Sequence, residues 1–80
     1  MYVINSNASK FIIGKKVIMI KNYTNGSIKL NVGEKGVVKD THTMNIPDMG
    51  LFNIRVLDLV FNNQTIHVGD QIAEEYMDII

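Results

Sequence analysis

Apolar and polar residues alternate with a period of two along most of the chain, and this pattern predicts β-strands. The first such segment is 15–21. Four consecutive apolar residues, 17–20, indicate that this strand is covered on both faces or enters a sharply curved sheet. The Asn25-Gly26 pair that follows predicts a turn within a long loop, because both residue types tolerate positive φ.

Two glycines mark the entry into a second strand. Gly33 and Gly36 enclose a polar pair that suits the apex of a turn, and residues 37–41 follow as a strand. The next segment, 41–50, is predicted to be a loop, because Pro47 cannot donate a hydrogen bond to a regular ladder.

The phase of the apolar pattern changes within residues 51–61. Phe52, Ile54 and Val56 share one parity, and Leu57, Leu59 and Phe61 share the other. A β-bulge near Val56 and Leu57 would bring both groups to the same side. The sequence therefore predicts a bulged, strongly bent third strand.

The last part of the chain contains the only helix signal. After a tight turn at 62–63, the pattern predicts a fourth strand with Ile66 and Val68 pointing inward. Asp70 suits a helix N-cap, and a single helical turn follows it. Residues 76–80 are then predicted to form a last strand that closes the barrel against the first. One continuous amphipathic helix over 71–80 is the alternative.

Length and composition indicate one small globular domain. The chain has 80 residues, of which 46% are hydrophobic and 20% charged, which allows one compact core and excludes a disordered chain. We assign residues 1–13 to an amino-terminal arm or extra edge strand and 14–80 to the β-domain. An unpaired apolar edge on this arm would favour a homo-oligomer.

Charge and missing residue types narrow the functions. Eight basic and eight acidic residues cancel, so no overall field attracts a nucleic acid. The absence of cysteine excludes a disulfide framework and a thiolate metal site. Short apolar runs and the lack of a signal-peptide pattern predict a cytoplasmic protein that does not enter membranes. The many Asn, Ile and Lys residues suit an AT-rich genome, an association that favours a small phage or mobile-element accessory protein.

No catalytic, metal or cofactor site is expected. His42 lies near Asp40 and Asp48, and His67 lies near Asp70, but neither spacing matches a metal-ligand motif. The serines occur in polar turns without the context of a nucleophile, so we predict no enzymatic activity. These serines are Ser6, Ser9 and Ser27.

The order of the predicted elements resembles an SH3-like small β-barrel over residues 14–80. The sequence Val-Gly-Glu-Lys-Gly-Val-Val at 32–38 is similar to the KOW-type turn of many such barrels. Together with residues 17–23 it resembles the SH3-like insert of RecD-type superfamily 1 helicases, although Val-Gly-Glu replaces Asn-Gly-Asp and the helicase motor motifs are absent. The resemblance implies an all-β, five-stranded barrel and a nucleic-acid-binding habit, but no activity.

The first candidate binding surface is the predicted 41–50 loop. Four of its residues are apolar where a turn would favour polar side chains, and methionine adapts to varied partner surfaces. The alternative is that the methionines cover an open end of the barrel as part of the core. A protein partner is our first expectation, through Met44, Ile46, Pro47, Met49 and, near the acidic end of the chain, Tyr76.

The second candidate surface is a group of basic residues that would bind nucleic acid. Antiparallel pairing of the first two strands would bring their lysines together, with Tyr23 as a platform on which a base could stack. The alternative is a solvated edge. The group comprises Lys15, Lys21, Tyr23, Lys35, Lys39 and the only arginine, Arg55.

Overall fold

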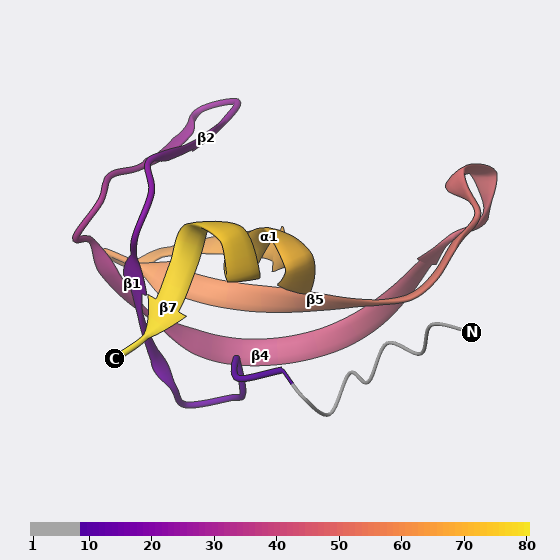
Figure 1. Cartoon of the computed structure of the whole chain (residues 1–80), viewed down its shortest axis with the longest axis horizontal. Helices are drawn as coiled ribbons and strands as arrows, with labels where there is room; N and C mark the ends of the chain where they lie inside the picture. Colours follow the sequence, from indigo (N-terminus) through magenta and orange to yellow (C-terminus); the bar gives the residue numbers. More distant parts are fainter. Residues whose placement is uncertain (1–8) are drawn as a thin grey trace.

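The computed structural model describes residues 9–80, which form a curved antiparallel sheet with a short helix on one face (Figure 1). Residues 1–8 of the predicted arm lie outside the described residues. The elements are β1 (Lys16–Met19), β2 (Tyr23–Asn25), β3 (Ile28–Leu30), β4 (Lys35–Ile46), the 3-10 helix η2 (Pro47–Met49), β5 (Leu51–Phe61), β6 (Gln64–Gly69), α1 (Asp70–Tyr76) and β7 (Met77–Ile79).

Five strands form the main sheet in the order β6-β5-β4-β1-β7, and β2 and β3 form a separate hairpin. The last strand pairs with the first, with Val17 opposite Ile79, as the sequence predicts. A continuous helix over 71–80 is wrong, because α1 ends at Tyr76. The outer strands β6 and β7 are not paired with each other, so the described sheet is mostly β but is not closed into a barrel.

The core lies between the concave face of the sheet and α1. Alternate residues of each strand point to this side, and α1 adds Ala73, which is fully buried. We call the opposite side of the sheet the outer face. The core consists of Phe11, Val17, Met19, Leu30, Val38, Leu57, Leu59, Phe61, Ile66, Val68, Ala73 and Met77.

Two short-range predictions near the helix can be compared with the structure. Asn62 and Asn63 have φ of 50° and 65° and form the tight β5–β6 turn, which suits asparagine. Asp70 is the first residue of α1 and not its N-cap, which is Gly69, and its carboxylate makes no capping hydrogen bond. That carboxylate is instead paired with Arg55.

The predicted loop over 41–50 is wrong for most of its length. Strand β4 continues to Ile46, and only η2 and Gly50 separate it from β5. Pro47 does end the ladder, as expected, but its effect does not reach back into the preceding residues. Thr41 and Thr43 are β-branched and suit a strand. The result is one long hairpin with a short tip.

The bulge predicted near Val56 and Leu57 is also wrong. These residues pair in continuous register with Gly69 and Val68 of β6, so they point to opposite faces of the sheet. The irregularities of the β4–β5 ladder lie elsewhere. One adds Lys39 to β4, between Val38 and Asp40, and the other is on β5 opposite the step from Met44 to Ile46.

Residues 9–13 belong to a packed arm and not to a strand. Phe11 is completely buried in the core. The backbone N–H of Gly14 donates to the carbonyl of Val38 at 2.8 Å, which fixes where the arm joins β1. The described part of the arm therefore contributes to stability through one aromatic anchor.

Gly36 occupies a position that has no room for a side chain. A Cβ there would lie 2.6 Å from the carbonyl oxygen of Val60 and 2.9 Å from the ring of Phe61. We expect Gly36→Ala to lower the free energy of unfolding by about 1–3 kcal/mol through overpacking. Urea denaturation would measure this loss.

Gly69→Ala is the matched control. No heavy atom lies within 4 Å of a Cβ built at Gly69, and its φ of −63° suits any residue. We expect a change within about 0.5 kcal/mol. Equal losses of stability for Gly36→Ala and Gly69→Ala would show that close packing around Gly36 does not cause the loss.

Candidate functional site

The β4–β5 hairpin extends beyond the strands that flank it (Figure 1). On one side β1 pairs with β4 only as far as Val37, and on the other β6 pairs with β5 only as far as Val56. In the part of the chain that the structure describes, residues 43–46 and 51–55 pair only with each other. We call residues 43–55 the hairpin tip.

Local hydrogen bonds give the hairpin tip a defined shape. Gly50 adopts φ of 67°, and its N–H donates to the carbonyl of Pro47 at 2.9 Å, which closes the 3-10 turn. Asn53 also has positive φ, 57°, and its N–H donates to the Oδ1 of Asn45 at 2.8 Å. A side chain thus replaces the ladder bond that the irregular register removes.

The hairpin tip exposes several large apolar side chains. Met44 is 44% exposed, Met49 69%, Leu51 40% and Phe52 62%. Ile46 is half-buried and Pro47 is exposed. Because none of these residues belongs to the core, the alternative that the methionines complete it is wrong.

Sequence reasoning missed Leu51 and Phe52 as part of this surface. Both fall in the predicted third strand, and the predicted bulge puts Phe52 on the same side as Leu57 and Leu59. The signal was present in the parity of the pattern: Phe52 is out of phase with Leu57 and Leu59, and without the bulge it has no route to the core. Phe52 instead lies at the solvent-exposed end of β5.

Tyr76 lies apart from the hairpin tip, at the carboxyl end of α1 next to β7 (Figure 1). Its ring packs edge-on against Tyr23 with centroids 5.1 Å apart. A hydrogen bond to Glu75 raises the pKa of the Tyr76 hydroxyl. The structure therefore does not bring Tyr76 together with the other predicted protein-binding residues.

The predicted nucleic-acid-binding residues are divided among several surfaces. Lys35 lies on the outer face of β4, whereas alternation along β1 puts Lys15 on the opposite side from Lys16. Lys39 is the extra residue of the β4 bulge, and Lys21 follows β1. The ring of Tyr23 is partly occupied by its contact with Tyr76.

Arg55 is engaged inside the protein. Its guanidinium donates to Ser9 Oγ at 2.7 Å and to Asp70 Oδ1 at 3.2 Å, and Ser9 Oγ donates to the same carboxylate oxygen at 2.7 Å. Only 16% of the Arg55 side chain is exposed. This network ties the arm and the start of α1 to β5, and it leaves the arginine poorly placed to contact a phosphate.

Both histidines approach the same carboxylate on the outer face. The Oδ1 of Asp58 lies 2.7 Å from Nδ1 of His67 and 3.7 Å from Nδ1 of His42, and neither Asp40 nor Asp48 is the partner of His42. The side chain of His67 is 67% exposed, as its outward position predicts. Across residues 9–80, no group of three or more His, Cys, Asp or Glu residues is arranged to hold a metal ion.

Comparisons with protein-family models, curated proteins and solved structures find no match to this chain. Among the described residues, none of the helical structure has the length and apolar character needed to span a bilayer. The function must therefore be argued from the surfaces themselves.

The Arg55 network yields a test of stability. Arg55→Met keeps an unbranched apolar side chain in place of the aliphatic part of the arginine but leaves Asp70 and Ser9 without their charged donor. We expect the free energy of unfolding to fall by about 1.5–3 kcal/mol, the usual effect of losing hydrogen bonds to a charged group. Urea denaturation would measure it, and an unchanged midpoint would contradict the structural role of the network.

The exposed pair of Lys10 and Asp78, 2.8 Å apart, yields a test of pH dependence. The hydrogen bond from Lys10 lowers the pKa of Asp78, and the same bond raises the pKa of Lys10. The pair therefore stabilises the fold between about pH 4 and pH 10. Its contribution is lost as pH falls through the lowered pKa of Asp78 or rises through the raised pKa of Lys10.

Asp78→Asn would be compared with the unchanged protein by urea denaturation at neutral pH and below the pKa of Asp78. The difference in stability should be small at neutral pH, because the pair is exposed, and should vanish in acid. A difference that persists in acid would show that the effect does not come from the ion pair, because Asn can still accept the N–H of Ile79.

Proposed function

We propose that this chain is a non-enzymatic β-domain that binds a protein partner through the hairpin tip. The observation that carries the proposal is the group of four exposed apolar side chains, Met44, Met49, Leu51 and Phe52. Exposed apolar patches of this kind mark interaction sites on soluble proteins. Methionine and phenylalanine are also enriched at protein interfaces.

The architecture of the hairpin supports the same proposal. A two-stranded ribbon is only marginally stable in water without further strands or a packed face. The tip has neither among the described residues. A partner that covers the apolar side chains would supply the missing face.

The energetics indicate how large the interface must be. Burying the exposed part of the four side chains is worth roughly 3–6 kcal/mol. A micromolar complex needs about 8 kcal/mol beyond the cost of association. The proposed interface therefore includes polar contacts as well, and the same hairpin tip also exposes Asn45, Asp48 and Asn53.

The local geometry lowers the cost of binding. The Asn45–Asn53 hydrogen bond and the closed turn at Gly50 already fix the backbone on both sides of the apolar residues. A preformed binding loop loses less conformational entropy when a partner binds.

The relation to SH3-like barrels also remains a proposal. It is supported by the succession of elements, with α1 between β6 and β7, and by the pairing of β7 with β1. This relation would make the hairpin tip an extension of a small binding scaffold, because the β4–β5 ladder continues past the last pairs of β1 and β6.

A double variant, Met49→Ser with Phe52→Ser, tests the function. Tagged protein would be used to capture partners from nuclease-treated extract of the source cell. We expect the bound protein to fall by about tenfold or more, because loss of a central apolar contact costs about 2 kcal/mol or more. Circular dichroism and urea denaturation would confirm that the variant is folded.

Ile13→Ser with Val32→Ser is the matched control, because these residues are 60% and 59% exposed but lie away from the tip. The control should capture as much partner as the unchanged protein. Equal loss in both variants would contradict binding through the tip. Capture that occurs from untreated extract but not from nuclease-treated extract would point to nucleic acid.

A further inference from the structure

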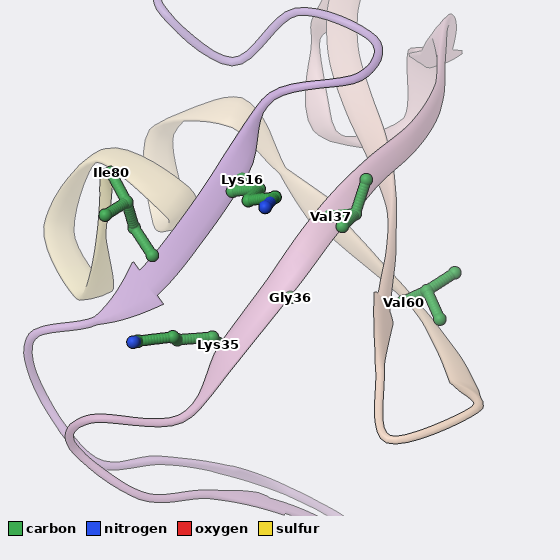
Figure 2. Close-up of a pocket in the computed structure, with 6 residues that line it drawn as sticks. All are labelled: Lys16, Lys35, Gly36, Val37, Val60 and Ile80. Atoms are coloured by element: carbon green, nitrogen blue, oxygen red, sulfur yellow. The ribbon is translucent and has the colours of Figure 1, made fainter.

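A pocket of about 310 Å³ lies on the outer face of the sheet, near the ends of β1 and β7 (Figure 2). Its lining is mostly apolar. Lys16 extends from β1 toward Val37, and Lys35 extends from β4 in the other direction, toward the end of β1 (Figure 2). The lining residues are Lys16, Lys35, Gly36, Val37, Val60 and Ile80.

The strand register builds this pocket. Lys16 of β1 lies opposite Val37 of β4, which lies opposite Val60 of β5. The N–H of Ile80 donates to the carbonyl of Lys16 at 3.0 Å, which adds Ile80 to the same row. Lys35 precedes Val37 by two residues and therefore shares its face.

The two lysines are available to a ligand. Within residues 9–80, no salt bridge includes Lys16 or Lys35. Asp78, which shares the outer face with its cross-strand neighbour Ile18, is taken by Lys10 at 2.8 Å. The pocket thus combines positive charge with apolar surface, and its complement is a group that is anionic and apolar at once.

We propose that this pocket binds an extended peptide segment of a protein partner in which an acidic residue stands two positions from a large apolar one, so that both side chains face the sheet. The carboxylate lies between the ammonium groups of Lys16 and Lys35. The apolar side chain covers Val37 and Val60, which are 39% exposed and half-buried.

The openness of the site favours a peptide over a small molecule. Lys16, Lys35 and Ile80 are all exposed, so a small ligand would keep much of its surface in water. Small-molecule sites usually bury most of their ligand. A peptide that continues on both sides of the pocket gains contacts with the neighbouring sheet surface.

The apolar floor also favours a peptide over a nucleic acid. A phosphate backbone is held by several basic groups along its path, and it gains nothing from Val37, Val60 or Ile80. The only arginine, Arg55, is engaged with Asp70. The pocket is separate from the hairpin tip, so this inference does not rest on the function proposed above.

The probe is a fluorescein-labelled octapeptide, two repeats of Glu-Ser-Leu-Ser, which puts Glu and Leu on one side of an extended chain. We call it the Glu-Leu peptide, and its binding to the whole chain would be followed by fluorescence anisotropy. Two comparison peptides replace Glu with Gln or Leu with Ser. We expect saturable binding of the Glu-Leu peptide and at least about fivefold weaker binding of both comparison peptides.

Two sets of variants locate the binding. Lys16→Gln with Lys35→Gln should weaken the Glu-Leu peptide by about fivefold or more, and Val37→Ser should weaken it too. The matched control, Lys21→Gln with Lys29→Gln, removes the same charge from exposed residues outside the pocket and should leave the affinity unchanged. Thermal unfolding would confirm that every variant is folded.

Each remaining outcome would overturn the proposal. The absence of saturable binding would show that the pocket is not a peptide site. Equal binding of the comparison peptide with Ser in place of Leu would show that the lysines attract any acidic peptide by charge alone. Octanoate that displaces the peptide at equal concentration would make the ligand a small amphiphilic acid. A thymidine oligonucleotide that binds more tightly and depends on the same lysines would make it a nucleic acid. Equal weakening by the Lys21 and Lys29 control would place the peptide outside the pocket.

Discussion

The structure depends on the antiparallel pairing of β4 with β5, which runs from Val37 and Val60 to the hairpin tip. Strands β1 and β6 pair directly with this ladder, and β7 joins the sheet through β1. Strand β1 aligns on the first part of β4, β6 on the second part of β5, and α1 covers the concave face between them (Figure 1). Because the ladder is longer than its neighbours, one half is buried in the core and the other half is left with exposed apolar side chains.

Curvature allows so short a chain to bury a core at all. Gly36 lets the backbone of β5 and the ring of Phe61 approach β4 closely, and the extra residue Lys39 bends the strand just beyond the β1 contact. The arm then adds Phe11 to the concave side. A flat sheet of this size would leave that face open to water, so the tight glycine contact and the bulge contribute directly to stability.

Local sequence signals predicted the elements better than the interactions between them. The turn at Asn62-Asn63 and the final strand agree with the prediction because each depends on a few adjacent residues. The turn before β4 lies at 32–33 and not at 34–35 as predicted, because β4 already begins at Lys35 and includes Gly36. The predicted second strand is shorter than β4, because the loop prediction extends the effect of Pro47 back over the β-branched Thr43, which favours a strand. The Arg55 network joins residues up to 61 positions apart, and no pattern within one strand indicates such a contact. The sequence indicates only part of the candidate surface. Met44 and Met49 are apolar residues in a predicted loop, whereas the predicted bulge puts Phe52 on the same side as Leu57.

The open edge of β4 constrains how a partner can use the hairpin tip. An unpaired strand edge invites a further strand, but the N–H of Thr41 is already bonded to the Oδ1 of Asp40 at 2.8 Å. The extra residue Lys39 also disturbs the register that an added strand would need. A partner strand would therefore pair poorly with the backbone of β4 near the core. The apolar side chains of the hairpin tip remain accessible to a partner. For the proposed partner of the hairpin tip, this favours recognition through side chains over addition of a strand to the sheet. At the proposed outer-face pocket β1 already pairs with β4, so a ligand there would also contact side chains, two of which are lysines.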